Sequence, residues 1–430
     1  MKKHIIHSIV FLLLVAYNLH AQTSTQMRNW YISPRKMDMS LSTPIPSTIT
    51  PVSGSSVAPT AASVANGMYD DNNNLLFYVS DNNVFDYNNT FMGSIPSGGA
   101  EITIVPFGNN SDCQRKFNVF STTGGFSSTS TLWRSVVDMN IFSITPILVD
   151  TISYQGLTST EYGAIAVGQL TASNTRYLYF LAGPGTINSP EAAIKKITIH
   201  IDGSTTKNGR IYPTQSNPNS NAGGEVFAQE LDLSPDGRWL AWASFASVND
   251  PLGTQYRYHL LELDLDGDYI NNSYKRFNIP IITGNNYVAD FRGVEFYQSA
   301  NSLKLFMGAG SDGIHYVILP WSNWANYPTP PPPTDFIQVV NSNQGYGFSQ
   351  IELSHNGFMY SSSDPAINMI QNVGAFNPSL IIPLILRWPQ SFTLSNPNPP
   401  KTTEGTGFYT LPDQIDGQDY SAIEKQASKE

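Results

Sequence analysis

A short unit of two apolar strands joined by a tight polar turn returns along this chain, and it constrains the fold more than any other feature. Its clearest copy is Leu231-Asp-Leu-Ser-Pro-Asp-Gly-Arg-Trp-Leu-Ala-Trp242, and another reads Ile351-Glu-Leu-Ser-His-Asn-Gly-Phe-Met-Tyr360. Asn, Asp and Gly accept the positive φ angles of hairpin turns, while aromatic and β-branched residues suit the flanking strands. Hairpin units repeated at intervals of tens of residues are typical of a β-propeller.

Six segments fit this unit, and further strand patterns lie between them, at residues 84–87, 133–138, 195–202, 257–264 and 314–319. Each repeat therefore supplies about four strands, which is the number in one propeller blade. The segments Trp30–Met39 and Leu380–Leu411 lie outside the six copies, and we expect N- and C-terminal strands to share a closing blade. The sequence predicts an all-β β-propeller, with seven blades favoured and six as the alternative. The predicted return strands of the six copies end near Tyr78, Phe120, Phe180, Trp242, Phe306 and Tyr360.

The beginning of the chain has the pattern of an export signal. Lys2 and Lys3 precede an apolar run from Ile5 to Ala16, and Leu19-His-Ala21 fits a cleavage site. We therefore predict a signal peptide at 1–21, the β-propeller at 22–415 and a polar tail at 416–430. Export would follow the Sec pathway, to the periplasm, the outer membrane or the extracellular space. No later apolar stretch is long enough for a transmembrane segment.

Charge and cysteine content narrow the classes of partner and of chemistry. The chain has 33 acidic and 23 basic residues, a net charge of −10, which argues against nucleic acid and anionic lipid as partners. Cys113 is the single cysteine, so no disulfide forms within the chain. We interpret Cys113 as a small core residue rather than as a nucleophile.

Two motifs that suggest ligands fit hairpin turns better. The run Gly308-Ala-Gly-Ser-Asp-Gly313 matches a dinucleotide-binding glycine pattern, but a strand pattern follows it where a helix is needed. The run Asp264-Leu-Asp-Gly-Asp268 lacks the Gly and the Glu of a calcium-binding EF-hand, because Tyr269 and Lys275 occupy those positions. Binding of adventitious calcium at this carboxylate-rich turn remains an alternative. The four histidines after the signal form no zinc-binding pattern. The sequence therefore predicts no catalytic residue, no cofactor and no metal site.

Three aromatic residues are the candidate contact residues. Trp321, Trp324 and Tyr327 precede a Pro-rich run at residues 328–333. Aromatic side chains in an exposed loop can stack on a sugar or hold a protein partner. The alternative is that they cap a blade and cover its core.

With these motifs together, the chain resembles a family of exported Bacteroidetes β-propeller proteins related to type IX secretion and gliding motility. The turn Ser234-Pro-Asp-Gly237 is also similar to TolB-like, WD40-like repeats. The resemblance implies an extracytoplasmic propeller of the cell envelope and implies no known reaction. Longer members carry a C-terminal sorting domain that is not visible here. The segments that carry the resemblance are Asn66–Val79, Arg134–Met139, Leu231–Trp242, Arg292–Phe296, Ile351–Tyr360 and Leu411–Gln414.

Because no catalytic constellation is recognisable, we interpret the chain as a binding or scaffold protein rather than an enzyme. Its partner would be an envelope protein or a glycan, within a secretion or motility assembly. The alternative is a glycan-active hydrolase or lyase with its site at the mouth of the propeller channel. Two or three carboxylates that converge there would favour this alternative. A purely structural subunit, a third interpretation, would be favoured by a large exposed apolar patch.

Overall fold

The computed structural model describes 29–32, 35–39, 46–48, 65–69, 74–80, 82–96, 102–108, 115–123, 130–152, 164–182, 193–212, 228–245, 256–278, 293–298, 302–308, 314–321, 333–340, 351–354, 359–363, 366–370 and 386–387. Within these segments the regular structure is β-strand, apart from the short 3-10 helix η3 (Pro333–Asp335). None of the helical structure described there has the length and apolar character that a membrane crossing requires.

The described strands form one three-stranded and six four-stranded antiparallel sheets, and within each sheet the strands pair in chain order. The three-stranded sheet contains β1 (Asn29–Ile32), β2 (Arg35–Asp38) and β3 (Pro46–Thr48). The next two sheets contain β4 (Ala65–Tyr69), β5 (Leu75–Ser80), β6 (Asn83–Asp86) and β7 (Phe91–Ser94), then β8 (Ile102–Pro106), β9 (Lys116–Thr123), β10 (Ser130–Asp138) and β11 (Ser143–Ile152). Two more contain β12 (Ile165–Val167), β13 (Thr175–Ala182), β14 (Ala193–His200) and β15 (Thr205–Tyr212), then β16 (Ala228–Leu233), β17 (Trp239–Phe245), β18 (Tyr256–Glu262) and β19 (Lys275–Asn278). The last two contain β20 (Val294–Gln298), β21 (Leu303–Gly308), β22 (Ile314–Leu319) and β23 (Ile337–Val340), then β24 (Ile351–Leu353), β25 (Met359–Ser363), β26 (Ala366–Ile370) and β27 (Leu386–Arg387).

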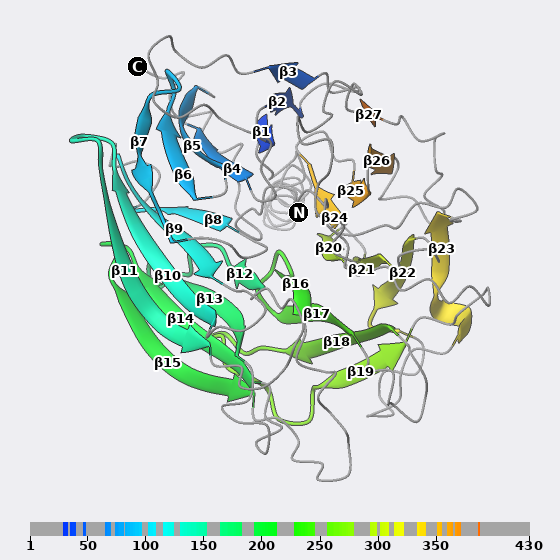
Figure 1. Cartoon of the computed structure of the whole chain (residues 1–430). Helices are drawn as coiled ribbons and strands as arrows, with labels where there is room; N and C mark the ends of the chain where they lie inside the picture. Colours follow the sequence, from blue (N-terminus) through cyan, green and yellow to red (C-terminus); the bar gives the residue numbers. More distant parts are fainter. Residues whose placement is uncertain are drawn as a thin grey trace, which may run out of the picture.

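The sheets are arranged around a common centre, with the first strand of each sheet innermost (Figure 1). This radial arrangement confirms the predicted all-β propeller architecture. The six predicted repeat copies form the first two strands of the six four-stranded sheets, and the strand patterns between them form third strands.

The clearest repeat folds as its sequence requires. Gly237 has a φ of +70° and donates its N–H to the carbonyl of Ser234 at 2.7 Å, which closes the turn between β16 and β17. The Ser234 hydroxyl donates to Asp236 at 2.6 Å and accepts the N–H of Trp239 at 2.8 Å. A residue with a side chain rarely adopts this backbone conformation, so the turn needs Gly at that position.

Apolar side chains fill the space between neighbouring sheets. One cluster joins Tyr258 and Phe277 of the β16–β19 sheet to Leu305 and Val317 of the β20–β23 sheet. The hydroxyl of Tyr258 crosses the same boundary and donates to the carbonyl of Gly308 at 2.6 Å. Each such fully buried side chain contributes about 1.5–3 kcal/mol, so packing between sheets is the main stabilising force.

The turn between the third and fourth strands of a sheet packs against the preceding sheet. The carbonyl of Gly203, between β14 and β15, accepts hydrogen bonds from Asn118 (3.0 Å) and Arg134. The carbonyl of Gly267, between β18 and β19, accepts one from the hydroxyl of Tyr179 at 3.1 Å. Both glycines have positive φ, +78° and +71°. These glycine turns therefore lock neighbouring sheets together.

The ends of the chain differ in part from the expectation. Strands β1 and β2 form within Trp30–Met39, as expected, but they belong to a sheet with β3. Within the segment 380–411, the described strand β27 pairs with β26, through Ala366–Arg387 and Ile367–Leu386. The outer edge of β26 would otherwise lack a partner, and this pairing gives its sheet a fourth strand.

Candidate functional site

Carboxyl side chains cap the free edges of two neighbouring inner strands, β20 and β24. The innermost strand of a sheet has a strand partner on one side only, so N–H groups on its other edge need different acceptors. The carboxylate of Glu230 accepts the N–H of Val294 at 2.8 Å, and that of Asp232 accepts the N–H of Phe296 at 2.6 Å. In both hydrogen bonds a backbone N–H of β20 donates to a carboxylate of β16.

The same relation continues from β20 to β24, where the carboxyl group of Glu295 accepts the N–H of Leu353. Asn66 makes a related contact on the other side of the ring, donating from its side chain on β4 to the carbonyl of Ile102 on β8 at 2.7 Å. Polar side chains of inner strands therefore join neighbouring sheets at three places around the centre, from β4 to β8, β16 to β20 and β20 to β24.

Four carboxyl groups gather at this junction. Glu230 and Asp232 lie on β16, Glu295 on β20 and Glu352 on β24, and their residues are only 3%, 5%, 7% and 7% exposed. Glu295 stands between Val294 and Phe296, the two residues whose N–H groups bond to Glu230 and Asp232. None of the first strands of the seven sheets contains Lys, Arg or His. The junction is thus strongly acidic and shielded from water.

Burial in this acidic environment gives Glu295 a different protonation from an ordinary glutamate. Loss of solvation, followed by the charges of Asp232, Glu352 and Glu230, raises the pKa of Glu295 well above its ordinary value. The hydrogen bond from the Leu353 N–H opposes the shift but does not cancel it. Glu230 and Asp232 each accept a backbone N–H from β20. The site therefore combines a glutamate of raised pKa with two carboxyl groups that are hydrogen-bonded to the backbone.

A neutral acid next to a carboxylate is the pair that hydrolysis of glycosidic bonds requires. A protonated carboxyl group has an O–H to donate, and a carboxylate can accept several hydrogen bonds. We predicted no catalytic role for these residues from the sequence. A partial signal exists, because Asp232, Glu295 and Glu352 each stand between apolar residues in the first strand of their repeats, as in Val294-Glu-Phe296 and Ile351-Glu-Leu353.

Of the predicted contact residues, the structure describes Trp321, which is only 4% exposed. Its ring packs edge-on against Phe277, with centroids 5.5 Å apart, and Lys275 lies 5.6 Å above it. This placement fits the alternative that the residue covers a core. Trp324 and Tyr327 lie outside the described residues, so their contact with a partner or glycan stays a prediction.

The two motifs interpreted as turns do connect antiparallel strands. Strands β21 and β22, on either side of the glycine-rich segment 309–313, pair directly. In the turn 264–268, Asp264 accepts the N–H groups of Asp266 and Asp268, at 3.0 and 2.9 Å, and Lys196 of the preceding sheet forms an ion pair with Asp268. The described residues contain no group of His, Cys, Asp and Glu arranged to hold a metal ion. Cys113 lies outside them.

Two strand histidines are buried. The imidazole of His259 stacks on Trp242, with centroids 4.8 Å apart, and bonds to the hydroxyl of Tyr274 at 2.8 Å. His315, on β22, is 2% exposed, and both ring nitrogens lack a hydrogen-bond partner among the described residues. Burial lowers the pKa of His315 to about 4, so it is neutral at pH 7. Both histidines are thus packed side chains of the strands.

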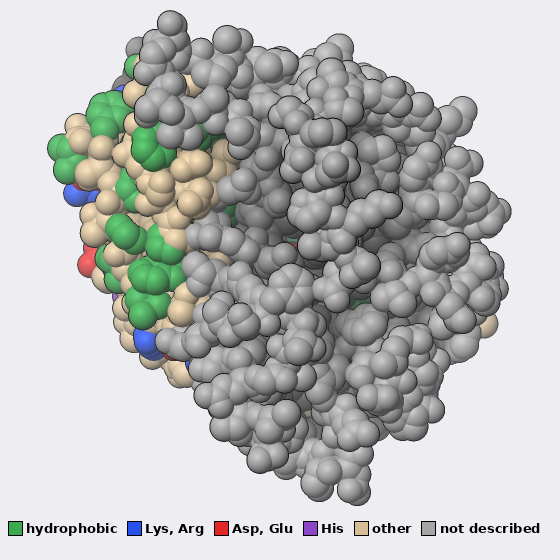
Figure 2. Space-filling view, in the orientation of Figure 1, with side chains coloured by type: hydrophobic (Ala, Val, Ile, Leu, Met, Phe, Trp, Pro, Cys, Tyr) green, Lys and Arg blue, Asp and Glu red, His purple; other side chains and the backbone are tan. Residues whose placement is uncertain are grey.

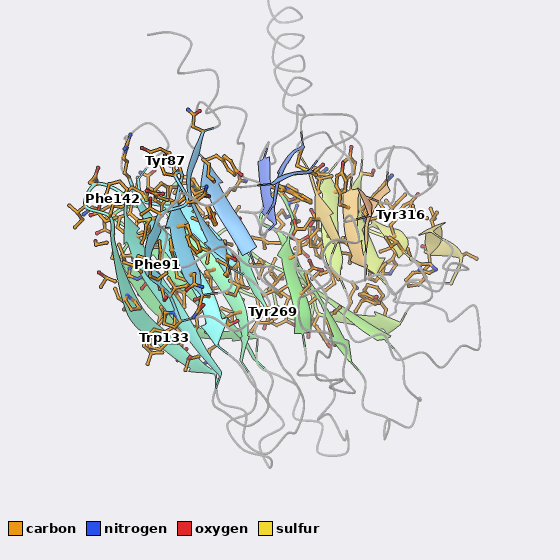
Figure 3. All side chains as sticks on the ribbon, turned by 45° about the horizontal axis from the view of Figure 1, so that its top comes forward. Tyr87, Phe91, Trp133, Phe142, Tyr269 and Tyr316 are labelled. Carbon is orange, nitrogen blue, oxygen red and sulfur yellow. The ribbon has the colours of Figure 1, made fainter. Side chains whose placement is uncertain are left out.

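Large apolar side chains are exposed on the side of the molecule that carries β7 and β11, where Figure 2 shows them among polar atoms. Figure 3 places Tyr87 and Phe142 at neighbouring hairpin ends, with Trp133 toward the other end of β10. Phe142 has a φ of +52°, unusual for a residue with a side chain. The exposed large apolar residues are Tyr87, Ile141, Phe142, Ile147, Leu148, Leu265 and Ile270.

Comparison with known proteins gives a fold likeness alone. No protein-family model and no curated protein matches the sequence. An arabinanase from Bacillus subtilis matches with a TM-score of 0.34 and 14% identity, over 65% of this chain and 96% of that one. A glucose dehydrogenase matches with a TM-score of 0.35 and 11% identity, over 70% and 92%. An ancestral GH74 enzyme matches with a TM-score of 0.46 and 13% identity, over 83% of this chain and 46% of that one.

The interpretation as a binding or scaffold protein is corrected here. It rested on the absence of a catalytic constellation, whereas the structure gathers four carboxyl groups on neighbouring inner strands. The matched structures include an arabinanase and a GH74 enzyme, and the likeness to them concerns the fold alone. The acidic residues of β16, β20 and β24 belong to repeats that are distant in the sequence, and only the radial packing of the repeats brings them together.

Proposed function

We propose that this protein is a glycan-active hydrolase whose acid–base site is the carboxyl cluster of Glu230, Asp232, Glu295 and Glu352. The observation that carries the proposal is that burial and neighbouring charges raise the pKa of Glu295 well above its ordinary value. A general acid must be protonated at working pH, and a carboxylate beside it must be ionised. This arrangement supports hydrolysis more than any other reaction class considered.

In the proposed reaction, Glu295 donates its proton to the glycosidic oxygen as the bond between that oxygen and the anomeric carbon breaks. Asp232 or Glu352 acts on the opposite side of the sugar, either attacking the anomeric carbon or removing a proton from the attacking water. Asp232 lies across from Glu295 on β16, and Glu352 lies beyond it on β24. The acidic surroundings keep the general acid protonated, and exclusion of bulk water strengthens that effect.

The proposed site requires a closed ring, and we propose that the propeller has seven blades. The ring of Trp30 on β1 packs edge-on against Tyr360 on β25, with centroids 5.5 Å apart, so the first and last sheets touch. A closing blade shared by N- and C-terminal strands remains part of this proposal. Closure of this kind removes the open ends of the array.

We also propose that the chain is exported through the Sec pathway and acts in the periplasm or at the outer membrane. The N-terminal pattern, Lys2 and Lys3 followed by an apolar run, supports this location. A glycan substrate in the cell envelope or beyond it is consistent with such a location.

Reducing-end release from a polysaccharide panel tests the proposed activity. The panel begins with arabinan and other neutral polysaccharides, and the protein without residues 1–21 is compared with Glu295→Gln. Loss of a general acid costs about 10²–10⁴-fold in rate, so this variant should retain at most about 1% of the activity. Glu262→Gln is the control, because Glu262 pairs with Arg238 on the surface, far along β18 from the cluster. Equal activity of Glu295→Gln and the parent protein would refute the assignment.

A further inference from the structure

The turns between the third and fourth strands of several sheets need one residue with positive φ. In three sheets this residue is Asn89 (+63°), Gly203 (+78°) or Gly267 (+71°), and its N–H bonds to the carbonyl three residues earlier. Between β10 and β11 it is Phe142, at +52°, whereas every other non-glycine residue with positive φ in the described part of the chain is asparagine. Asn and Gly tolerate this conformation far better than an aromatic residue. The β10–β11 turn therefore holds Phe142 against the preference of its own backbone.

Packing inside the molecule does not offset this unfavourable conformation. Phe142 is 52% exposed, and its neighbour Ile141 is 70% exposed. A ring buried in the core could compensate for an unfavourable φ, but these two side chains lie mostly in solvent. Backbone strain that is retained without internal packing points to a role in contact with something outside the chain.

The turn of the neighbouring sheet adds an exposed aromatic ring beside them. Tyr87, between β6 and β7, is 57% exposed. Strand β7 packs against β11, since Cδ1 of Ile144 lies 3.1 Å from the position that a Cβ on Gly93 would occupy. Figure 3 shows Tyr87 and Phe142 at adjoining ends of these two hairpins. We call Tyr87, Ile141 and Phe142 the tip cluster.

The charged side chains exposed beside the tip cluster are basic. The N–H of Met139 donates to the carbonyl of Arg115 at 2.7 Å, which places Arg115 next to the β10–β11 turn. Arg115 and Lys116 are both exposed. Lys116 pairs with Asp138 at 3.1 Å and still has 47% of its side chain exposed.

The carboxylates of the same two hairpins are turned inward. Asp86 and Asp138 are only 7% and 8% exposed. Asp86 accepts the N–H of Asn88 at 2.8 Å, and Asp138 accepts that of Asn140 at 2.9 Å. The hairpin ends thus present apolar groups and positive charge to the outside and keep their negative charge within the turns.

A turn on another sheet has an exposed apolar residue with the opposite charge pattern. Leu265, between β18 and β19, is 92% exposed, but Asp264, Asp266 and Asp268 around it are exposed as well. An anionic group would be repelled at this turn and attracted at the tip cluster. Charge, rather than apolar exposure alone, therefore distinguishes the tip cluster.

We propose that the tip cluster docks on the surface of a zwitterionic phospholipid bilayer. Its three side chains would insert at the level of the headgroups, while Arg115 and Lys116 contact the lipid phosphates. Aromatic residues favour this interfacial layer, and basic side chains reach headgroups with their charged ends while their stems cover apolar surface. The net charge of −10 disfavours a strongly anionic bilayer, which is why a zwitterionic surface is the partner. Docking does not depend on the proposed hydrolase activity.

Flotation with vesicles of phosphatidylethanolamine and phosphatidylcholine tests the docking on the protein without residues 1–21, because the apolar run of the predicted signal peptide could bind lipid by itself. Phe142→Asn installs the residue type of Asn89 in the β10–β11 turn, and burial of a Phe side chain is worth at least about tenfold in binding. Vesicle binding should therefore fall at least about tenfold in Phe142→Asn. Ile141→Asn should lower it as well, whereas Leu265→Asn should bind like the parent.

Failure of the parent to float with the vesicles would overturn the proposal. So would equal flotation of the parent and Phe142→Asn, which would show that the exposed ring does not contact lipid. A loss in Leu265→Asn as large as that in Phe142→Asn would also overturn it, because any exposed apolar residue would then have the same effect.

Urea unfolding of the same variants separates a contact role from a structural one. Asn accepts the positive φ, so Phe142→Asn should lower the unfolding equilibrium constant by about three- to tenfold while it weakens vesicle binding. A loss of stability in this variant would assign Phe142 to folding and overturn the proposal. Ile141→Asn should leave stability nearly unchanged and keeps the binding test interpretable. Unchanged hydrolysis by either variant would show that docking and the proposed enzyme activity are separate properties.

Discussion

The glycine turns that lock neighbouring sheets together predict a specific stability effect for Gly267→Ala. Gly267 has a φ of +71°, which costs an alanine about 1–2 kcal/mol. An added Cβ would also lie 2.4 Å from the hydroxyl oxygen of Tyr179 and 2.6 Å from Cδ2 of Tyr177. Forcing a methyl group into a filled space costs about 1–3 kcal/mol. The free energy of unfolding should therefore fall by about 2–5 kcal/mol.

Gly237→Ala is a matched control for this change. Gly237 has nearly the same φ, +70°, but nothing lies within 4 Å of an added Cβ. Gly237→Ala should lower the free energy of unfolding only by the cost of the positive φ, about 1–2 kcal/mol. Urea unfolding followed by fluorescence, extrapolated linearly to water, gives both values. If the two variants lost the same stability, the turn 264–268 would not be packed against β13 and β14, and the reasoning would be refuted.

Two further predictions concern buried cationic and titratable groups. Lys196→Met keeps most of the side-chain volume but removes the hydrogen bond to the Asp266 carbonyl (2.8 Å), so unfolding free energy should fall by about 1–3 kcal/mol. Lys207→Met removes an exposed ion pair of 3.7 Å with Asp150 and should change the free energy of unfolding by less than about 1 kcal/mol. Equal losses of stability in the two variants would contradict a stabilising role for the buried Lys196 hydrogen bond. His315 has a folded pKa of about 4, below its ordinary 6.5, so the unfolded chain binds its proton first and stability falls as the pH drops through this interval. Between about pH 7 and pH 5 the loss should be about 2 kcal/mol in urea unfolding, and His315→Leu should remove that part; an unchanged pH dependence would argue against a buried neutral histidine.

The repeat and its strands were predictable because their signals are local. The Ser234-Pro-Asp-Gly237 turn contains its own hydrogen-bonding groups, and Gly237 provides the positive φ that the turn needs. Alternation and aromatic content likewise marked strands such as β14 and β22. These features act over a few residues, so they can be read without knowing the neighbours in space.

The carboxyl cluster was not predictable in the same way, because it depends on contacts between repeats. Glu230, Glu295 and Glu352 belong to three different copies, and Glu295 and Glu352 each look like an isolated acidic residue between apolar residues. Only the radial packing places them at one junction, where desolvation and mutual repulsion change the pKa of Glu295. For Trp321 the local pattern suggested an exposed contact residue, with covering of a core as the alternative. Its ring is packed against Phe277, a contact that the local sequence does not reveal.

The protonation state of Glu295 tests the central claim most directly. Infrared difference spectroscopy between the parent protein and Glu295→Gln at about pH 7 isolates the carbonyl stretch of a protonated carboxyl group. The account predicts that this band is present in the parent, absent in Glu295→Gln and unchanged in Glu262→Gln. A carboxylate signal for Glu295 at the same pH, with no protonated band, would contradict the assignment of Glu295 as the general acid.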